Sequence, residues 1–196
     1  DCAELQGSFF FFYVLSITFN RQGIEQITDR TRECEILSEP LEFTIQEDTS
    51  DTWSHRRIYY NGPIRDAVAF SSPVLIEKGP LRCTVRLDGT GGNSEFQLLV
   101  SLIKGSPAAI CCLRTNYREH MSVLKLNCYP CSRITGRKDL VSGGWISRPL
   151  ENQEFPLNHA VSLETESGRI GMVLPDSFAL DVDERCARPT LIRNNV

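Results

Sequence analysis

The sequence predicts an all-β protein built from antiparallel strands. Apolar and polar residues alternate with a period of two along much of the chain, which is typical of strands that have one buried and one wet face. Gly, Pro and Asn residues fall between these segments, where turns require them. No window of about twelve residues carries an apolar stripe at helical spacing, and 10 prolines and 13 glycines interrupt most candidates. We therefore expect little helix.

The expected strands follow in chain order. The apolar run 9–15 is the first, and a noisier alternating segment at 14–19 adjoins it. The clearest alternation comes next, with Leu41, Phe43 and Ile45 on one face, and it recurs at 81–88. Further strands are expected at 96–103, 109–117, 123–128, 159–165, 169–174 and 189–193, and a loop at 176–188. Turn chemistry recurs every 8 to 15 residues or so, as in a sandwich of long strands.

Composition and charge indicate one ordinary globular domain over residues 1–196. The chain is 41% hydrophobic and 23% charged, and it contains no low-complexity tract or repeat. A net charge of -4 provides no basic field for nucleic acid or for an anionic membrane surface. The run 9–15 is far shorter than the roughly 20 residues that span a bilayer. We expect neither nucleic acid nor membrane as a partner.

The cysteines favour a reducing compartment. Eight cysteines in 196 residues are too sparse for a disulfide-stapled small protein. No Asn-x-Ser/Thr acceptor for glycosylation occurs anywhere in the sequence. We therefore expect a cytoplasmic location.

No motif predicts a metal or catalytic site. Cys128 and Cys131 form a CxxC motif, but a structural zinc site needs a second ligand pair and a redox pair should open a helix. These cysteines are interpreted as core or edge thiols, with one disulfide left open. His55, His120 and His159 lie outside the spacings that bring two imidazoles to one metal. We expect no metal ligand and no catalytic residue in this chain.

One segment suggests sugar binding. Acidic residues, among them Asp51, cluster just ahead of Trp53. An aromatic ring can stack on the CH face of a sugar while carboxylates bond its hydroxyl groups. Asp51 and Trp53 are therefore the candidate substrate-binding residues. The alternative is a polar loop with one packed tryptophan.

The order of several segments resembles the β domain of glycoside hydrolase family 38, the retaining α-mannosidases. The similar segments are collinear over almost the whole chain, although each is loose alone: ITFNRQGIEQITDR from Ile17, EDTSDTW from Glu47, LIEKGPLRCTVRL from Leu75, KGSPAA from Lys104, SGGWISRPLENQEFP from Ser142, GRIGMVLPDSFALDV from Gly168 and RPTLIRNN from Arg188. After Glu154, Phe155 and Pro156 the sequence departs from the family's His-Arg-Trp-Ala-Asp type of run. Any role of that Trp or Asp is therefore in doubt here.

The resemblance implies a galactose-mutarotase-like antiparallel supersandwich that follows a catalytic domain. In the family, the zinc ligands and the aspartate nucleophile come from preceding domains, so no catalytic residue is carried over and zinc is expected only in the catalytic domain of a parent enzyme. The chain is then a fragment of a longer multidomain hydrolase and inactive alone. Its partners would be its own catalytic domain and a mannoside, and a homo-oligomer is left open.

Three functional hypotheses follow. The first is a non-catalytic sandwich domain of an α-mannosidase-like hydrolase, which packs on the catalytic domain and helps to shape the sugar site. The second is a free-standing carbohydrate-binding or interaction module. The third is an autonomous mutarotase-like or epimerase-like enzyme, which would need His and Glu side chains to converge in a cleft.

Overall fold

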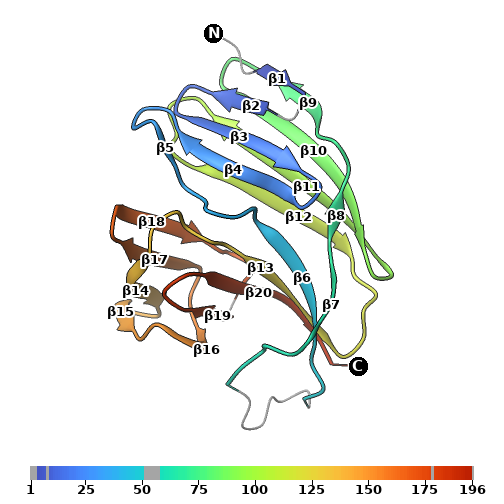
Figure 1. The fold of residues 1–196 in the computed structure, drawn as a ribbon, viewed down its shortest axis with the longest axis vertical. Coiled ribbons are helices and arrows are strands. Elements are labelled where there is room, and N and C mark those ends of the chain that lie inside the picture. Colours follow the sequence, from blue (N-terminus) through green and yellow to red (C-terminus); the bar gives the residue numbers. More distant parts are fainter. Residues whose placement is uncertain (1–3, 8, 51–57, 178, 196) are drawn as a thin grey trace. The chain divides into compact units, whose positions relative to one another are not determined.

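The protein is an all-β structure. The computed structural model describes residues 4–7, 9–50, 58–177 and 179–195, and these form twenty strands and no helix (Figure 1). The predicted fold class is therefore confirmed. Among the residues described, no helix is long and apolar enough to cross a membrane.

The chain divides into two compact units, each of which is described by itself. The first unit comprises Asp1–Glu42 and Ala67–Glu119, and the second comprises Phe43–Asp66 and His120–Val196. Each unit is thus assembled from two separate stretches of sequence. The expectation of a single domain over residues 1–196 stays a prediction.

The first unit contains two antiparallel sheets. One has five strands in chain order: β1 (Glu4–Gln6), β2 (Phe9–Phe12), β3 (Leu15–Asn20), β4 (Gly23–Asp29) and β5 (Cys34–Glu35). The other has the order β12 (Ala109–Asn116), β11 (Ser94–Ile103), β10 (Arg82–Gly91) and β8 (Ala69–Phe70), with β9 (Val74–Lys78) also paired to β10.

The inner faces of these two sheets form the first core. On β11 every second residue from Ser94 to Leu102 is buried, and on β10 Val85 and Leu87 are buried. Gly23 starts β4 with a φ of 114°, and a Cβ there would lie 3.2 Å from the Phe70 ring and 3.7 Å from Leu98. The backbone of one sheet therefore touches side chains of the other, and glycine fits that approach.

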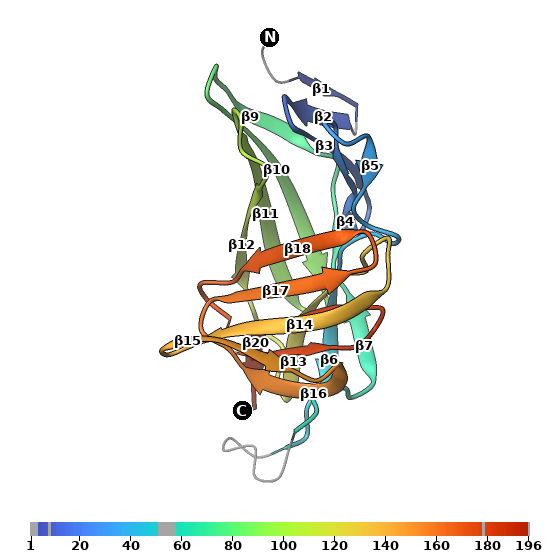
Figure 2. The same ribbon diagram turned by 90° about the vertical axis from the view of Figure 1, so that its left-hand side faces the viewer.

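The second unit also contains two sheets. Its six-stranded sheet has the order β16 (Glu151–Pro156), β19 (Ala179–Val182), β20 (Ala187–Asn194), β13 (Ser122–Asn127), β6 (Glu42–Glu47) and β7 (Ile64–Ala67). The four-stranded sheet has the order β15 (Gly144–Arg148), β14 (Ile134–Val141), β17 (Ala160–Thr165) and β18 (Gly168–Val173). Figure 2 shows the latter four strands side by side.

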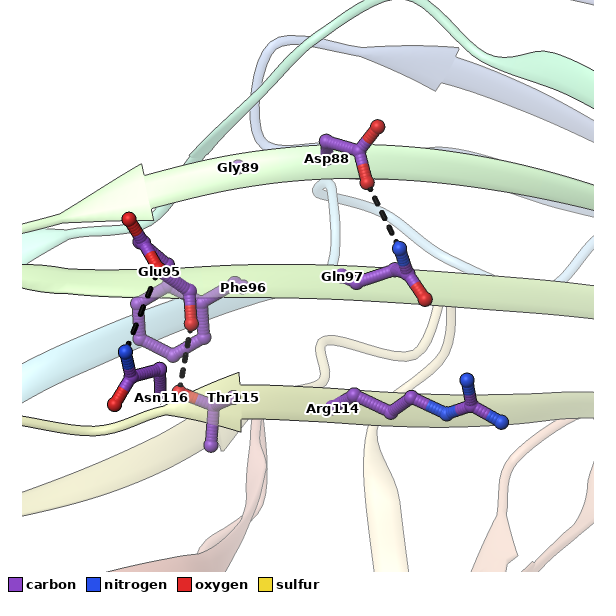
Figure 3. Close-up of a pocket in the computed structure, with 8 residues that line it drawn as sticks. All are labelled: Asp88, Gly89, Glu95, Phe96, Gln97, Arg114, Thr115 and Asn116. Atoms are coloured by element: carbon purple, nitrogen blue, oxygen red, sulfur yellow. Dashed lines mark hydrogen bonds between the residues drawn. The ribbon is translucent and has the colours of Figure 1, made fainter.

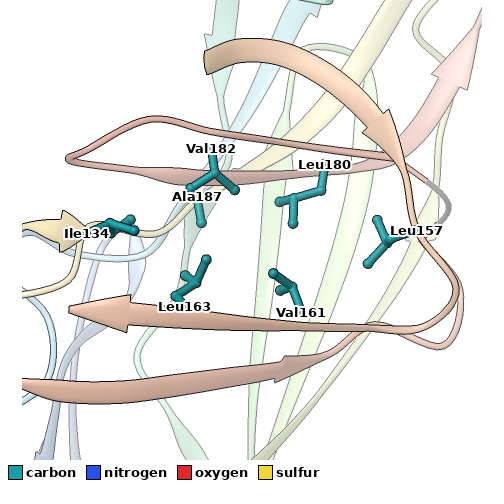
Figure 4. Packing of buried hydrophobic residues seen from close by; sticks show 7 residues of the cluster. All are labelled: Ile134, Leu157, Val161, Leu163, Leu180, Val182 and Ala187. Carbon is teal, nitrogen blue, oxygen red and sulfur yellow. The ribbon is translucent and has the colours of Figure 1, made fainter. Parts of the chain in front are cut away.

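An apolar cluster fills the space between these two sheets. Val161 and Leu163 of β17 point toward Leu180 and Val182 of β19 (Figure 4). The cluster is completed by Ile134, Leu157 and Ala187, and all of its members are buried. Because Leu180 and Val182 face this cluster, the side chain between them, Asp181, faces the other side of the six-stranded sheet.

Two predictions about elements were wrong. The apolar run 9–15 is two strands of a hairpin, because Tyr13 adopts a φ of 52° and turns the chain between β2 and β3. The expected loop at 176–188 contains β19 and the first residues of β20. In β19 three consecutive residues are buried, so the short strand shows little alternation in exposure.

The other expected strands are confirmed to within one or two residues at most ends. The segments predicted at 41–46, 96–103 and 109–117 are β6, β11 and β12. The alternation at 81–88 continues further than expected, since β10 runs to Gly91 before the turn at Gly92 and Asn93.

Candidate functional site

The predicted sugar-binding residues lie outside the part of the chain that the structure describes. Asp51 and Trp53 both belong to the undescribed segment 51–57, as does His55. Whether they bind a sugar therefore stays a prediction. The residues on either side of this segment are described, and they show how its two ends are attached to the six-stranded sheet.

The first attachment is a buried cluster around Asp48. The Arg193 guanidinium donates from Nε to Asp48 Oδ2 over 2.7 Å, and the Asn195 amide donates to the same oxygen over 2.9 Å. Asp48 Oδ1 accepts from both the backbone N–H, at 3.0 Å, and the hydroxyl of Ser50. Asn195 also donates to the Ser50 carbonyl over 2.9 Å. The chain that leads into segment 51–57 is thus tied to the end of β20.

The second attachment holds the chain that leaves the segment. The backbone N–H of Glu154 in β16 donates to the Ile58 carbonyl over 2.8 Å. The Arg193 guanidinium lies 5.0 Å from the centre of the Tyr60 ring, within the range of a cation–π contact. Arg193 therefore contacts residues on both sides of segment 51–57.

The Asp48 cluster makes stability depend on acid. Burial opposes ionisation of Asp48, but hydrogen bonds from Ser50, Arg193 and Asn195 outweigh it and lower the pKa of Asp48 from 3.8 to about 2. A carboxyl group whose pKa is lower in the folded state stabilises the fold above its unfolded pKa, and this contribution is lost as the pH falls from about 4 to about 2.

We expect Asp48→Asn to lower the free energy of unfolding by about 1–2 kcal/mol at pH 7, because one pKa unit corresponds to about 1.4 kcal/mol and the cluster borders solvent. The difference between Asp48→Asn and wild type should shrink toward zero near pH 2. Urea unfolding at a series of pH values measures it. Asp176→Asn, at an exposed carboxylate, is the control. A difference for Asp48→Asn that is independent of pH would contradict the role of ionisation.

A second buried cluster lies on the polar face of the six-stranded sheet. Lys125 of β13 contacts both Glu154 of β16 and Asp181 of β19 through its Nζ atom. The three side chains are only 1%, 7% and 5% exposed. Thr190, the register partner of Lys125, donates its hydroxyl to Glu154 over 3.2 Å. One buried ammonium group thus bridges two carboxylates on the polar side of the six-stranded sheet.

Arg188 extends this cluster toward the surface. Its Nε donates to Asp181 over 2.5 Å, and its Nη2 donates to Asp183 over 2.8 Å and to Asn152 over 2.6 Å. Burial raises the pKa of Glu154 above the ordinary carboxyl range, against the attraction of Lys125.

Lys125, Glu154 and Asp181 form a structural ion-pair cluster that links three strands of the sheet, here called the Lys125 lock. A glycosidase needs two carboxylates that face a sugar across an open cleft. Glu154 and Asp181 instead share one ammonium group and are almost completely buried. A shifted pKa occurs at catalytic sites and also in structural ion-pair networks. Because Glu154 is almost completely buried against Lys125, its raised pKa belongs to a structural network.

A further buried ion pair lies on β14. Arg137 donates to both carboxylate oxygens of Asp139, over 2.6 and 2.7 Å, and to the Leu180 carbonyl over 3.0 Å. Both side chains are 0% exposed. The guanidinium groups of Arg137 and Arg148 lie 5.4 and 4.7 Å from the centre of the Phe155 ring. This pair fixes the edge of the core between the two sheets of the second unit.

The remaining sequence candidates do not converge. Cys128 is buried and Cys131 is exposed, and Cys111 and Cys112 follow each other on β12. His120 and His159 lie before β13 and before β17, in different parts of the second unit. Among the described residues, no group of three or more His, Cys, Asp or Glu side chains could hold a metal ion.

A shallow groove lies on the outer face of the first unit, across β10, β11 and β12. Its volume is about 520 Å³. Figure 3 shows the residues that line it, most of which have polar side chains: Asp88, Gly89, Glu95, Phe96, Gln97, Arg114, Thr115 and Asn116. The sequence did not predict this groove, because each of these polar residues could equally belong to an ordinary solvent-exposed strand face. Only the pairing register of the three strands shows that they lie together.

The comparisons with known proteins agree with this fold. The family model for the glycosyl hydrolases family 38 C-terminal domain matches residues 13–184. No curated protein shows a match to the sequence.

Two solved structures from Enterococcus faecalis share the fold. An α-mannosidase of strain V583 superposes with a TM-score of 0.81 at 12% sequence identity, and the match covers 97% of this chain and 26% of that one. A protein in glycosyl hydrolase family 38 also gives 0.81 at 12% identity, and covers 96% and 27%. The chain spans about a quarter of the length of these proteins. Because the family model matches most of the sequence, the chain belongs to glycosyl hydrolase family 38, in the region of that family's C-terminal domain.

Proposed function

We propose that this chain is the non-catalytic β-sandwich domain of an α-mannosidase-like glycoside hydrolase. The observation that carries the proposal is the match of residues 13–184 to a C-terminal domain, in a chain that spans about a quarter of structurally similar proteins. Its role is to pack on the catalytic domain of the parent enzyme. That domain would supply the zinc ion and the nucleophile that act on the mannoside.

The packing of the second unit supports this division of labour. The two carboxylates of its buried cluster, Glu154 and Asp181, contact Lys125 and are too buried to reach a substrate. The attachments at Asp48 and Tyr60 hold both ends of segment 51–57. Asp51 and Trp53, which come between these attachments in the sequence, are proposed to help shape the sugar site.

The chain alone should not hydrolyse a mannoside. We expect no release of nitrophenol from p-nitrophenyl α-mannoside, with or without added zinc, because under this proposal the zinc ligands and the nucleophile belong to the catalytic domain, and no group of described side chains could hold a metal ion. The measurement is absorbance over several hours at micromolar protein, with a complete family 38 enzyme as the positive control. Zinc-dependent turnover by the purified chain would overturn the proposal. The mass of the native polypeptide tests it independently, since a parent enzyme carries several hundred more residues.

A free-standing carbohydrate-binding module is the second candidate. The pairing of Asp51 with Trp53 in the sequence favours it, because an aromatic ring can stack on a sugar while a carboxylate bonds its hydroxyl groups. Calorimetry with mannose oligosaccharides separates the two candidates when it is combined with Trp53→Ala. Binding that this substitution abolishes supports the module, whereas the absence of any binding that depends on Trp53 favours the docking domain.

We also propose a cytoplasmic location. Among the described cysteines, Cys34, Cys111 and Cys112 are exposed free thiols. Exposed free thiols persist in a reducing compartment. Thiol titration of protein isolated from its native cells, without reductant, would give the full number of cysteines if this is correct.

A further inference from the structure

The outer face of the β10–β11–β12 sheet carries two polar rows. In the first, Asp88 pairs with Gln97, and Gln97 pairs with Arg114. In the second, Thr90 pairs with Glu95. Glu95 also pairs with Asn116 (Figure 3). Register partners point to the same side of a sheet, and successive rows on one face are about 7 Å apart along the strands. The six side chains therefore form a compact polar surface.

The donors and acceptors of this surface are not all used within the protein. Arg114 is exposed, and its guanidinium forms no hydrogen bond or ion pair with any residue that the structure describes. Gln97 donates its amide N–H to Asp88 over 3.1 Å, while the amide oxygen of Gln97 accepts no hydrogen bond from the described residues. Asn116 contacts Glu95 only at 3.4 Å, and turning its amide over lets its oxygen accept from Arg118 over 2.6 Å instead. The Glu95 carboxylate is then available.

The charges in the groove nearly balance. Asp88 and Glu95 are negative and Arg114 is positive, and Arg86 lies 3.2 Å from Asp88. A site for an anion or a cation would present one sign of charge in excess. Sugar hydroxyl groups act both as donors and as acceptors, so a mixture of carboxylate, amide and guanidinium groups suits them. The half-buried Leu99 stands beside Gln97 on the same face and offers apolar contact to a CH face.

We propose that this groove binds a neutral oligosaccharide through its hydroxyl groups. Its volume of about 520 Å³ is within the usual range of small-ligand sites. Phe96 is buried, so its ring belongs to the core and does not stack on the sugar. Binding therefore rests on hydrogen bonds and on the contact with Leu99, without a stacked aromatic ring, and is weak, with a Kd on the order of 1 mM. The inference goes beyond the proposed function, because it needs neither a catalytic domain nor Trp53.

The test is a titration of the isotope-labelled full chain with mannotriose, followed by amide NMR. Shifts are expected at residues 88–97 and 114–116, and Arg114→Ala should weaken binding about tenfold because a charged hydrogen bond is lost. Arg21→Ala, at another exposed arginine of the first unit whose side chain has no described partner, should leave the Kd unchanged. Both positions are exposed, and an unchanged thermal midpoint checks that each variant folds.

Three results would overturn the inference. These are the absence of shifts at the solubility limit of the sugar, shifts confined to other residues, and equal binding by Arg114→Ala and wild type. Inorganic phosphate is the probe for an anion site, and phosphate shifts at the same residues would likewise reject a saccharide site. Turnover in the nitrophenyl assay concerns the proposed function only, so the two proposals fail separately.

Discussion

Replacement of Lys125 by methionine is expected to lower the free energy of unfolding by about 3–5 kcal/mol, because it leaves two buried carboxylates without their shared cation. Lys125 is 1% exposed and contacts both Glu154 and Asp181. Methionine keeps most of the side-chain volume, so the loss comes from charge and hydrogen bonding. Urea unfolding followed by circular dichroism measures the change.

Lys138→Met is the matched control for this substitution. Lys138 is 48% exposed and lies 3.7 Å from Glu164, an exposed ion pair that is worth about 0–1 kcal/mol. The triple variant with Lys125→Met, Glu154→Gln and Asp181→Asn removes the charges together and should recover part of the loss. Equal destabilisation by Lys125→Met and Lys138→Met would contradict the lock. So would a triple variant less stable than Lys125→Met alone.

The period-two pattern predicted strands well where only one face is buried. Leu87 and Asp88 of β10 show this, since one is buried and the other is exposed. The pattern failed at β19, because Asp181 is buried like its neighbours Leu180 and Val182. It also failed at Tyr13, where a positive φ in an apolar run starts a hairpin that no Gly or Asn announces.

The buried ion pairs were beyond sequence reasoning for a physical reason. Glu154 and Asp181 lie 29 and 56 residues after Lys125 in the sequence. Only the strand order of the six-stranded sheet brings the three together. One local signal existed, since Lys125 is a lone charge between Leu124 and Leu126. Such a lysine either reaches solvent or meets a partner, and the sequence does not say which. Asp51 and Trp53 stay predictions.

Asp139→Asn is the second substitution with a large expected effect. The Arg137 guanidinium is 0% exposed, and Asp139 accepts two hydrogen bonds from it. Asparagine keeps the shape of the side chain but removes the charge, so a buried cation remains uncompensated. We expect a loss of about 3–5 kcal/mol in the free energy of unfolding at pH 7, measured by urea unfolding.

The exposed Arg82–Glu77 pair is the control that tests whether burial causes the large effect expected of Asp139→Asn. Glu77 likewise accepts from one arginine, here from Arg82 Nε at 2.9 and 3.1 Å from its two oxygens, but the side chains are 58% and 39% exposed. Glu77→Gln should therefore cost far less than Asp139→Asn, because water solvates the arginine that is left. If both substitutions cost the same, burial does not decide the strength of these pairs. The structural account of the Lys125 lock, which rests on the same physics, would then fail with it.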